Sequence, residues 1–106
     1  MINEDRLQKA LVYLAETDEE AAKARAYMIG LEKNEKTIIG IEYLKTQGTV
    51  PERDARARKS EAYEQWKSDY ENAVADYELY RNKRHTEELI VEVWRSENAN
   101  RRRGNV

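Results

Sequence analysis

The residues of this chain that could carry chemistry are few and scattered. Among 106 residues there is one histidine, His85, and no cysteine, so neither a nucleophile–base pair nor a thiolate or His-rich metal site can be assembled. Carboxylates recur at helical spacing, as in Glu61 and Glu64, but a di-metal helical bundle needs inward-facing Glu-x-x-His repeats, which are absent. The four glycines lie too far apart to form a phosphate loop. We therefore predict a protein that is not an enzyme and has no cofactor and no metal site.

Aromatic rings beside basic residues are a first candidate for a binding surface. The chain has seven Tyr and two Trp, and such rings can stack on unpaired bases where cations lie alongside. One grouping contains Tyr77, Tyr80, Arg81, Lys83 and Arg84, and another contains Trp94, Arg95 and the arginines at 101–103. The alternative is that the rings form the core of a helical structure, because Tyr can bury its ring and keep its hydroxyl in water. The heptad spacing between residues 63 and 77 favours this alternative there.

Three consecutive arginines near the end of the chain are a second candidate. Such residues on a flexible end contact phosphate groups without reading sequence, although they also serve as a solubilising tail. The stretch 61–78 is acidic, with six acids against one lysine, and opposes nucleic acid binding. The predicted contact residues for nucleic acid or for a partner protein are Arg81, Lys83, Arg84, Trp94, Arg95, Arg101, Arg102 and Arg103.

Long helices must position all of these residues. The chain is 38% charged, lacks Phe, and has no Gly or Pro between Pro51 and Gly104, a composition typical of long helices or coiled coils. Apolar and aromatic residues recur at steps of three and four. The sequence predicts an all-α fold with helices at about 4–16, 18–46 and 50–98, which form one domain over residues 1–98.

The ends of these helices carry recognisable signals. Asn3 is a predicted N-cap. Thr17 with Glu20 has the pattern of a capping box, but no Gly or Pro precedes it, so both a kink near Thr17 and an unbroken helix are compatible with the sequence. Gly48 suits the end of a helix, and Thr49 with Pro51 suits the start of the next. So short a connection predicts a long antiparallel helical hairpin that resembles a coiled coil.

The register of this hairpin leaves one apolar segment without an assigned cover. The residues before Gly48 lie opposite residues at a similar distance after it, so the second helix covers the third only to about Tyr80. The segment 89–94, Leu-Ile-Val-Glu-Val-Trp, lies beyond. Either the first helix covers it, through Leu7, Leu11 and Leu14, or a second copy of the chain does. We predict a homo-oligomer, because a two-helix hairpin buries little apolar area.

The two ends of the chain carry the remaining predictions. Residues 99–106 have no apolar periodicity and are predicted to be a flexible basic tail. The N-terminus is acidic and leads into no apolar stretch, so we expect no signal peptide. No apolar run approaches the length of a membrane span. We expect a cytoplasmic protein without membrane contact.

Three segments resemble small helical proteins encoded by tailed bacteriophages and prophages. They are Leu89–Gly104 (LIVEVWRSENANRRRG), Tyr13–Glu20 (YLAETDEE) and Leu44–Val50 (LKTQGTV). The resemblance implies a role in phage DNA metabolism, near genes for recombination and replication, and therefore the host cytoplasm. It assigns no role to any residue.

Together these features predict an accessory protein of phage DNA recombination or replication. It would contact nucleic acid, or a recombination or replication protein, through its Arg-rich C-terminal end. The alternative is a helical adaptor or inhibitor that binds a phage or host protein through a helix face, without nucleic acid.

Overall fold

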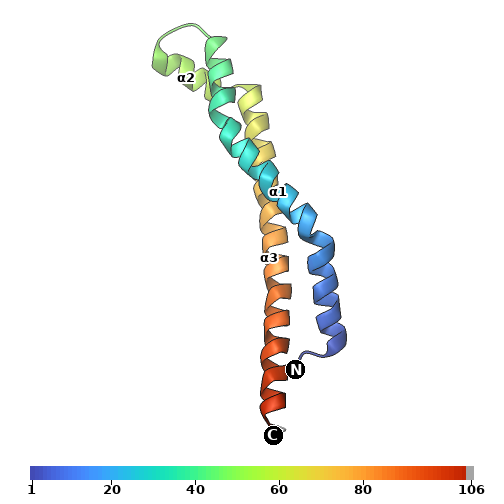
Figure 1. Cartoon of the computed structure of the whole chain (residues 1–106). Helices are drawn as coiled ribbons and strands as arrows, with labels where there is room; N and C mark the ends of the chain where they lie inside the picture. Colours follow the sequence, from blue (N-terminus) through green and yellow to red (C-terminus); the bar gives the residue numbers. More distant parts are fainter. Residues whose placement is uncertain (105–106) are drawn as a thin grey trace. The chain divides into compact units, whose positions relative to one another are not determined.

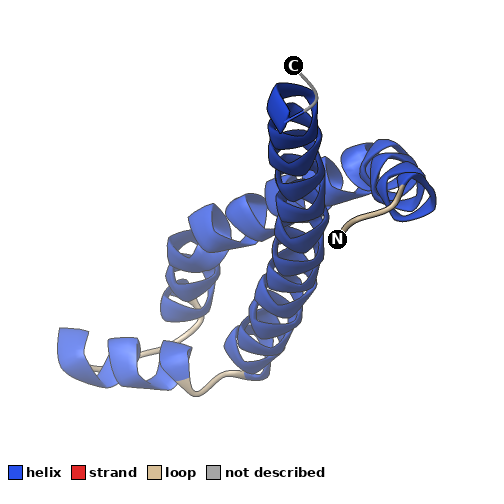
Figure 2. Cartoon of the chain, turned by 90° about the horizontal axis from the view of Figure 1, so that it is seen from below, coloured by secondary structure: helices blue, strands red, loops and turns tan. Residues whose placement is uncertain are grey.

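Three helices make up the chain in a computed structural model that describes residues 1–104 (Figure 1). They are α1 (Glu4–Leu44), α2 (Val50–Arg58) and α3 (Glu61–Gly104), and the described residues contain no strand (Figure 2). The predicted all-α fold is thus confirmed. The helices contribute to two compact units. Unit 1 contains Met1–Ala22 and the described part of Glu78–Val106, and unit 2 is Lys23–Tyr77.

α1 starts where the sequence predicts and then continues without a break. The Asn3 side chain accepts a hydrogen bond from the Arg6 backbone N–H at 2.8 Å, which confirms Asn3 as the N-cap. A separate first helix at 4–16 is wrong, because α1 runs through Thr17. The Thr17 hydroxyl does not cap a new helix; it donates to the Tyr13 carbonyl at 2.7 Å. Without Gly or Pro nearby, this bond to the preceding turn is compatible with a continuous helix.

The turn after α1 has the predicted signals. Gly48 has a positive φ of 126°, and a Cβ atom there would lie 2.5 Å from a Glu52 carboxylate oxygen, so only glycine fits without strain. The Thr49 side chain accepts from the Glu52 N–H at 3.4 Å, and the Glu52 carboxylate accepts from the Thr49 N–H at 3.3 Å. This capping box, with Pro51 in the first turn, starts α2.

The predicted single helix over residues 50–98 is wrong, because the chain breaks at Lys59 and Ser60. The Ser60 hydroxyl accepts a hydrogen bond from the Tyr63 N–H at 3.2 Å and caps α3, and Glu61 and Glu64 lie in the first turn of α3. A serine followed by acids favours a helix start. α2 therefore lies at an angle to the neighbouring parts of α1 and α3 in unit 2 (Figure 1).

In unit 2 the later part of α1 packs antiparallel against the start of α3. The Trp66 indole N–H donates to the Leu31 carbonyl at 2.8 Å, and the Tyr63 hydroxyl donates to Glu35 at 2.9 Å. The buried and half-buried positions follow heptad spacing on both helices: Ala24, Met28, Leu31, Glu35 and Ile38 on α1, and Tyr63, Trp66, Tyr70, Ala73 and Tyr77 on α3. The predicted hairpin with coiled-coil spacing is therefore present in this unit.

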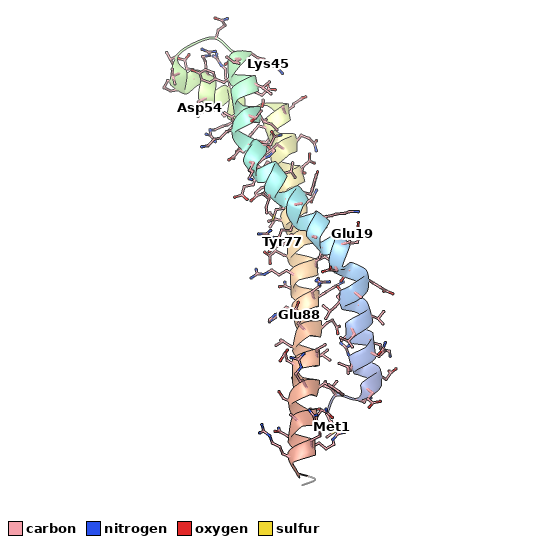
Figure 3. All side chains as sticks on the ribbon, in the orientation of Figure 1. Met1, Glu19, Lys45, Asp54, Tyr77 and Glu88 are labelled. Carbon is pink, nitrogen blue, oxygen red and sulfur yellow. The ribbon has the colours of Figure 1, made fainter. Side chains whose placement is uncertain are left out.

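In unit 1 the beginning of α1 lies along the end of α3. The Ile2 N–H donates to the Glu97 carboxylate at 3.0 Å, and Arg6 Nη2 lies 2.8 Å from both carboxylate oxygens of Glu87. Figure 3 shows Met1 beside the last turns of α3. Of the two arrangements left open by the sequence, the structure has the one in which the first part of α1 faces the apolar segment 89–94. Leu7 and Leu14 are half-buried there.

The buried core is small and consists mostly of alanine. The fully or nearly buried residues among those described are Ala10 in unit 1 and Ala57, Trp66 and Ala73 in unit 2. Alanine at these positions lets the helix backbones approach each other closely. Leu11 was expected to cover the apolar segment of α3, and this is wrong, because its side chain is 44% exposed. It lies next to the heptad positions 7, 10 and 14 and not on them.

The end of α3 differs from the predicted flexible tail. Residues 99–104 are helical, so the predicted boundary at residue 99 is wrong for them; Asn105 and Val106 lie outside the described residues. Ala99 and the arginines are favourable helix formers. Arg101, Arg102 and Arg103 also lie in the last turn, where positive charge interacts favourably with the helix dipole.

Two adjacent residues of α1 provide a test of the packing in unit 1. Ala10→Glu places a carboxylate in a fully buried position and should lower the free energy of unfolding by about 2 to 4 kcal/mol. Leu11→Glu, at an exposed position, should change it by less than about 1 kcal/mol. Urea denaturation followed by circular dichroism measures both. Equal effects of the two substitutions would contradict the packing of unit 1.

Candidate nucleic-acid or partner interface

The eight predicted contact residues all lie on α3 in unit 1. They do not converge on one site, because residues 81 and 103 are separated by about 33 Å along a helix at 1.5 Å per residue. Their surroundings differ, and these differences divide them into structural residues, residues with local ion partners, and residues free for a ligand.

Arg84 belongs to the packing of unit 1. One of its guanidinium nitrogens, Nη1, donates to the Leu14 carbonyl at 2.8 Å and to the Thr17 hydroxyl at 2.7 Å, and Nη2 donates to Asp18 at 3.2 Å. The side chain of Arg84 is only 18% exposed. Because three of its N–H groups are bonded to α1 and little of the side chain is exposed, we exclude Arg84 from the proposed contact surface.

Arg81 and Arg95 are exposed but have acidic neighbours on their own helix. Arg81 pairs with Glu78 at 3.7 Å and Arg95 pairs with Glu92 at 3.1 Å. Exposed pairs of this kind contribute little to stability, but each carboxylate offsets part of the positive charge that a phosphate would meet. Lys83 is exposed and has no ion pair among the described residues.

The last turn of α3 is the most basic surface of unit 1. Arg101, Arg102 and Arg103 are all exposed, and none of them forms an ion pair within the described part of the chain. The nearest acid in sequence, Glu97, already accepts the hydrogen bond from Ile2. Arg101 Nη2 lies 3.1 Å from the Met1 sulfur, a weak acceptor. The guanidinium groups at this end are therefore available to an anion.

The aromatic residues divide as the heptad spacing predicts. In unit 2 the Trp66 ring stacks with the rings of Tyr63 and Tyr70, with centroid distances of 5.3 Å in both pairs. Trp66 is 7% exposed, so these rings form the core and are not a platform for bases. The hydrogen bond to the Glu35 carboxylate raises the pKa of Tyr63 above its ordinary value. In unit 1 Trp94 is half-buried at a heptad position of the inner face.

The turn of unit 2 is an exposed surface that the sequence did not single out. Leu44 is 77% exposed and Val50 is 67% exposed. Basic residues lie close to them in the sequence, and two of these make local contacts: Arg53 lies over the Tyr43 ring at 4.1 Å and Arg56 donates to the Gln47 carbonyl. The signal in the sequence is an apolar residue on each side of a short connection.

The role of Arg84 can be tested against an exposed arginine on the same helix. Arg84→Met removes three hydrogen bonds between α3 and α1 and should lower the free energy of unfolding by about 1 to 2 kcal/mol. The matched variant Arg95→Met loses only an exposed local pair and should stay within about 0.5 kcal/mol of the wild type. Thermal and urea unfolding measure the difference. If Arg84→Met left the free energy of unfolding unchanged, Arg84 would again be a candidate contact residue.

No group of His, Asp or Glu side chains in residues 1–104 could hold a metal ion, and no helix among them is long and apolar enough to cross a membrane. Comparisons with models of known protein families, with characterised proteins and with solved structures find no match to this chain.

Proposed function

We propose that this chain is a non-enzymatic accessory protein of phage DNA recombination or replication, which contacts nucleic acid through the C-terminal end of α3. The observation that carries this proposal is the last turn of that helix, where Arg101, Arg102 and Arg103 are exposed and form no ion pair with any residue in 1–104. The resemblance of the segment 89–104 to tailed-phage proteins supports the biological setting, in the host cytoplasm. A recombination or replication protein with an acidic surface could bind at the same end.

The contact with nucleic acid would be electrostatic and independent of base sequence. Arginine side chains donate hydrogen bonds to phosphate oxygens without reading base edges. The carbonyl end of a helix carries partial negative charge, so the backbone gives a phosphate no help, and the long arginine side chains must extend beyond it. Three arginines can neutralise about three phosphates, which gives a modest affinity that falls steeply with salt.

Replacement of the three arginines tests the proposal. The triple variant Arg101→Gln, Arg102→Gln and Arg103→Gln should weaken binding of labelled single- or double-stranded DNA at low salt by at least about tenfold. It should also reduce the slope of log affinity against log salt by about two to three. Fluorescence anisotropy with short DNA probes measures both quantities.

The control is a variant that keeps the charge. Changing the same three residues to lysine should preserve most of the affinity, because the phosphate contact depends mainly on positive charge. Absence of DNA binding by the wild type at about 50 µM protein and low salt would contradict the proposal. Equal binding by the glutamine variant would contradict the assignment to the last turn.

A helical adaptor or inhibitor that binds a phage or host protein is the second candidate function. The observation that favours it is the apolar turn of unit 2, where Leu44 and Val50 are among the most exposed large apolar side chains described. Larger exposed apolar patches with a polar rim mark protein-binding surfaces, and these two residues flank one short connection, at the end of α1 and the start of α2. The neighbouring lysine and arginine residues suit a partner with acids around an apolar pocket.

The two candidate functions predict opposite results in one pull-down experiment. If the adaptor function is correct, Leu44→Glu with Val50→Glu should lose a partner from phage-infected cells, while the Arg101 to Arg103 glutamine variant keeps it. Both sites are exposed, so circular dichroism should show folded protein in each case. Loss of the same partner only in the glutamine variant would argue against the adaptor surface at the turn.

A further inference from the structure

The outer face of α3 in unit 1 carries a row of uncharged residues. The row consists of Leu79, Asn82, Thr86, Leu89, Val93, Ser96 and Asn100. Successive members are three or four residues apart, and all of them are exposed. The chain is 38% charged, and the solvent face of a surface helix normally carries its charged residues. Here the charged residues lie beside the row and none lies in it.

The spacing of this row is that of a coiled-coil seam. Steps of three and four keep one face of a helix turned toward a neighbouring helix over several turns. Leu79, Leu89 and Val93 are 57%, 51% and 45% exposed. The inner face of α3 in this unit has its own heptad row, which includes the half-buried residues Val91 and Trp94. The helix therefore has two seams, and α1 lies against only one of them.

The order of residues in the outer row is self-complementary. Leu79, Asn82, Thr86 and Leu89 read apolar, polar, polar, apolar in either direction. In an antiparallel pair of identical helices, Leu79 of each copy faces Leu89 of the other, and Asn82 faces Thr86. Apolar residues then meet apolar residues and amides meet hydroxyls, as a two-fold interface between identical surfaces requires.

Charge selects the antiparallel over the parallel arrangement. A parallel pair would bring the exposed clusters Arg101–Arg103 of both copies side by side, with strong repulsion. An antiparallel pair separates them by reversing one helix. The acids beside the row, Glu78 and Glu92, would approach each other across an antiparallel pair, but each already pairs with an arginine of its own helix, Arg81 and Arg95 respectively.

We propose that unit 1 binds a second copy of this chain through residues 79–89 of the outer row of α3, antiparallel, with the two-fold axis at the level of residue 84 along the helix, on the face opposite to the Arg84 side chain. The interaction surface is distinct from the arginine cluster and from the apolar turn, so it does not depend on the proposed function. Only a few apolar layers contribute, so the dimer is a weak one that forms at micromolar concentrations.

Sedimentation equilibrium between about 5 and 300 µM protein tests the assembly. The average mass of the wild type should rise with concentration from the 12.5 kDa of one chain toward twice that mass. Leu89→Lys should remain a monomer over this range, and so should Thr86→Lys, which alters an exposed polar position. Leu44→Lys is the control, since it places the same charge on an exposed leucine of unit 2, and should dimerise like the wild type. Circular dichroism should show equal helicity in all four proteins.

Cysteine cross-linking tests the relative orientation of the two copies. The sequence has no native cysteine, so only the introduced cysteines can form disulfides. A mixture of Asn82→Cys and Thr86→Cys chains should give a disulfide-linked heterodimer under mild oxidation, while each variant alone should give little product. A parallel pair would give the reverse, because each cysteine would then face itself. A wild type that stays monomeric at 300 µM, a dimer that survives both lysine substitutions, or efficient cross-linking of the single variants would each overturn the proposal.

Discussion

A contact between two antiparallel helices has only one line of side chains to bury, and the whole structure depends on how that line is filled. In both units the line follows heptad spacing, with a buried alanine in each: Ala10 in unit 1 and Ala73 in unit 2. Three of its polar positions have a partner on the opposite helix: Glu35 with Tyr63, Glu87 with Arg6, and Thr17 with Arg84. A polar group at a helix contact is paired in few alternative registers of the two helices. The small apolar core would allow α1 and α3 to pair in several registers. We therefore infer that these polar pairs fix the observed one.

Much of the fold could be predicted because its signals are local. The N-cap at Asn3, the turn at Gly48 and the capping box at Thr49 each depend on a few adjacent residues, and heptad spacing identified the aromatic core around Trp66. The helix boundaries predicted from the sequence are wrong where two local signals compete. Thr17 could cap a new helix or hydrogen-bond within a continuing one, and the tertiary contact with Arg84 accompanies the second choice. At Ser60 the chain does break, without Gly or Pro, and the Ser60 hydroxyl caps the helix that follows.

The candidate contact residues were less predictable than the fold, for a related reason. Closeness in the sequence places Arg84 in one group with Arg81 and Lys83. The heptad phase separates them, since Arg84 follows Tyr80 by four residues and precedes Glu87 by three, on the inner face. That signal was available in the sequence and would have identified Arg84 as structural. By contrast, the pairing of Glu97 with the Ile2 backbone, which engages the acid nearest to the terminal arginines among residues 1–104, needs the three-dimensional structure.

In unit 1, α3 has an inner face, an outer face and a basic end, and the two proposals use the last two of these. The inner face of α3 in unit 1 is occupied by α1. A ligand that binds this part of α3 must therefore use the outer face or the basic end. The outer row and the last turn share no residue, so self-association does not compete with phosphate binding. An antiparallel pair also places its two arginine clusters at opposite ends of the contact. Such a pair would bind a nucleic acid at two separated points, and its apparent affinity would exceed that of a single cluster only where the ligand is long enough to reach both.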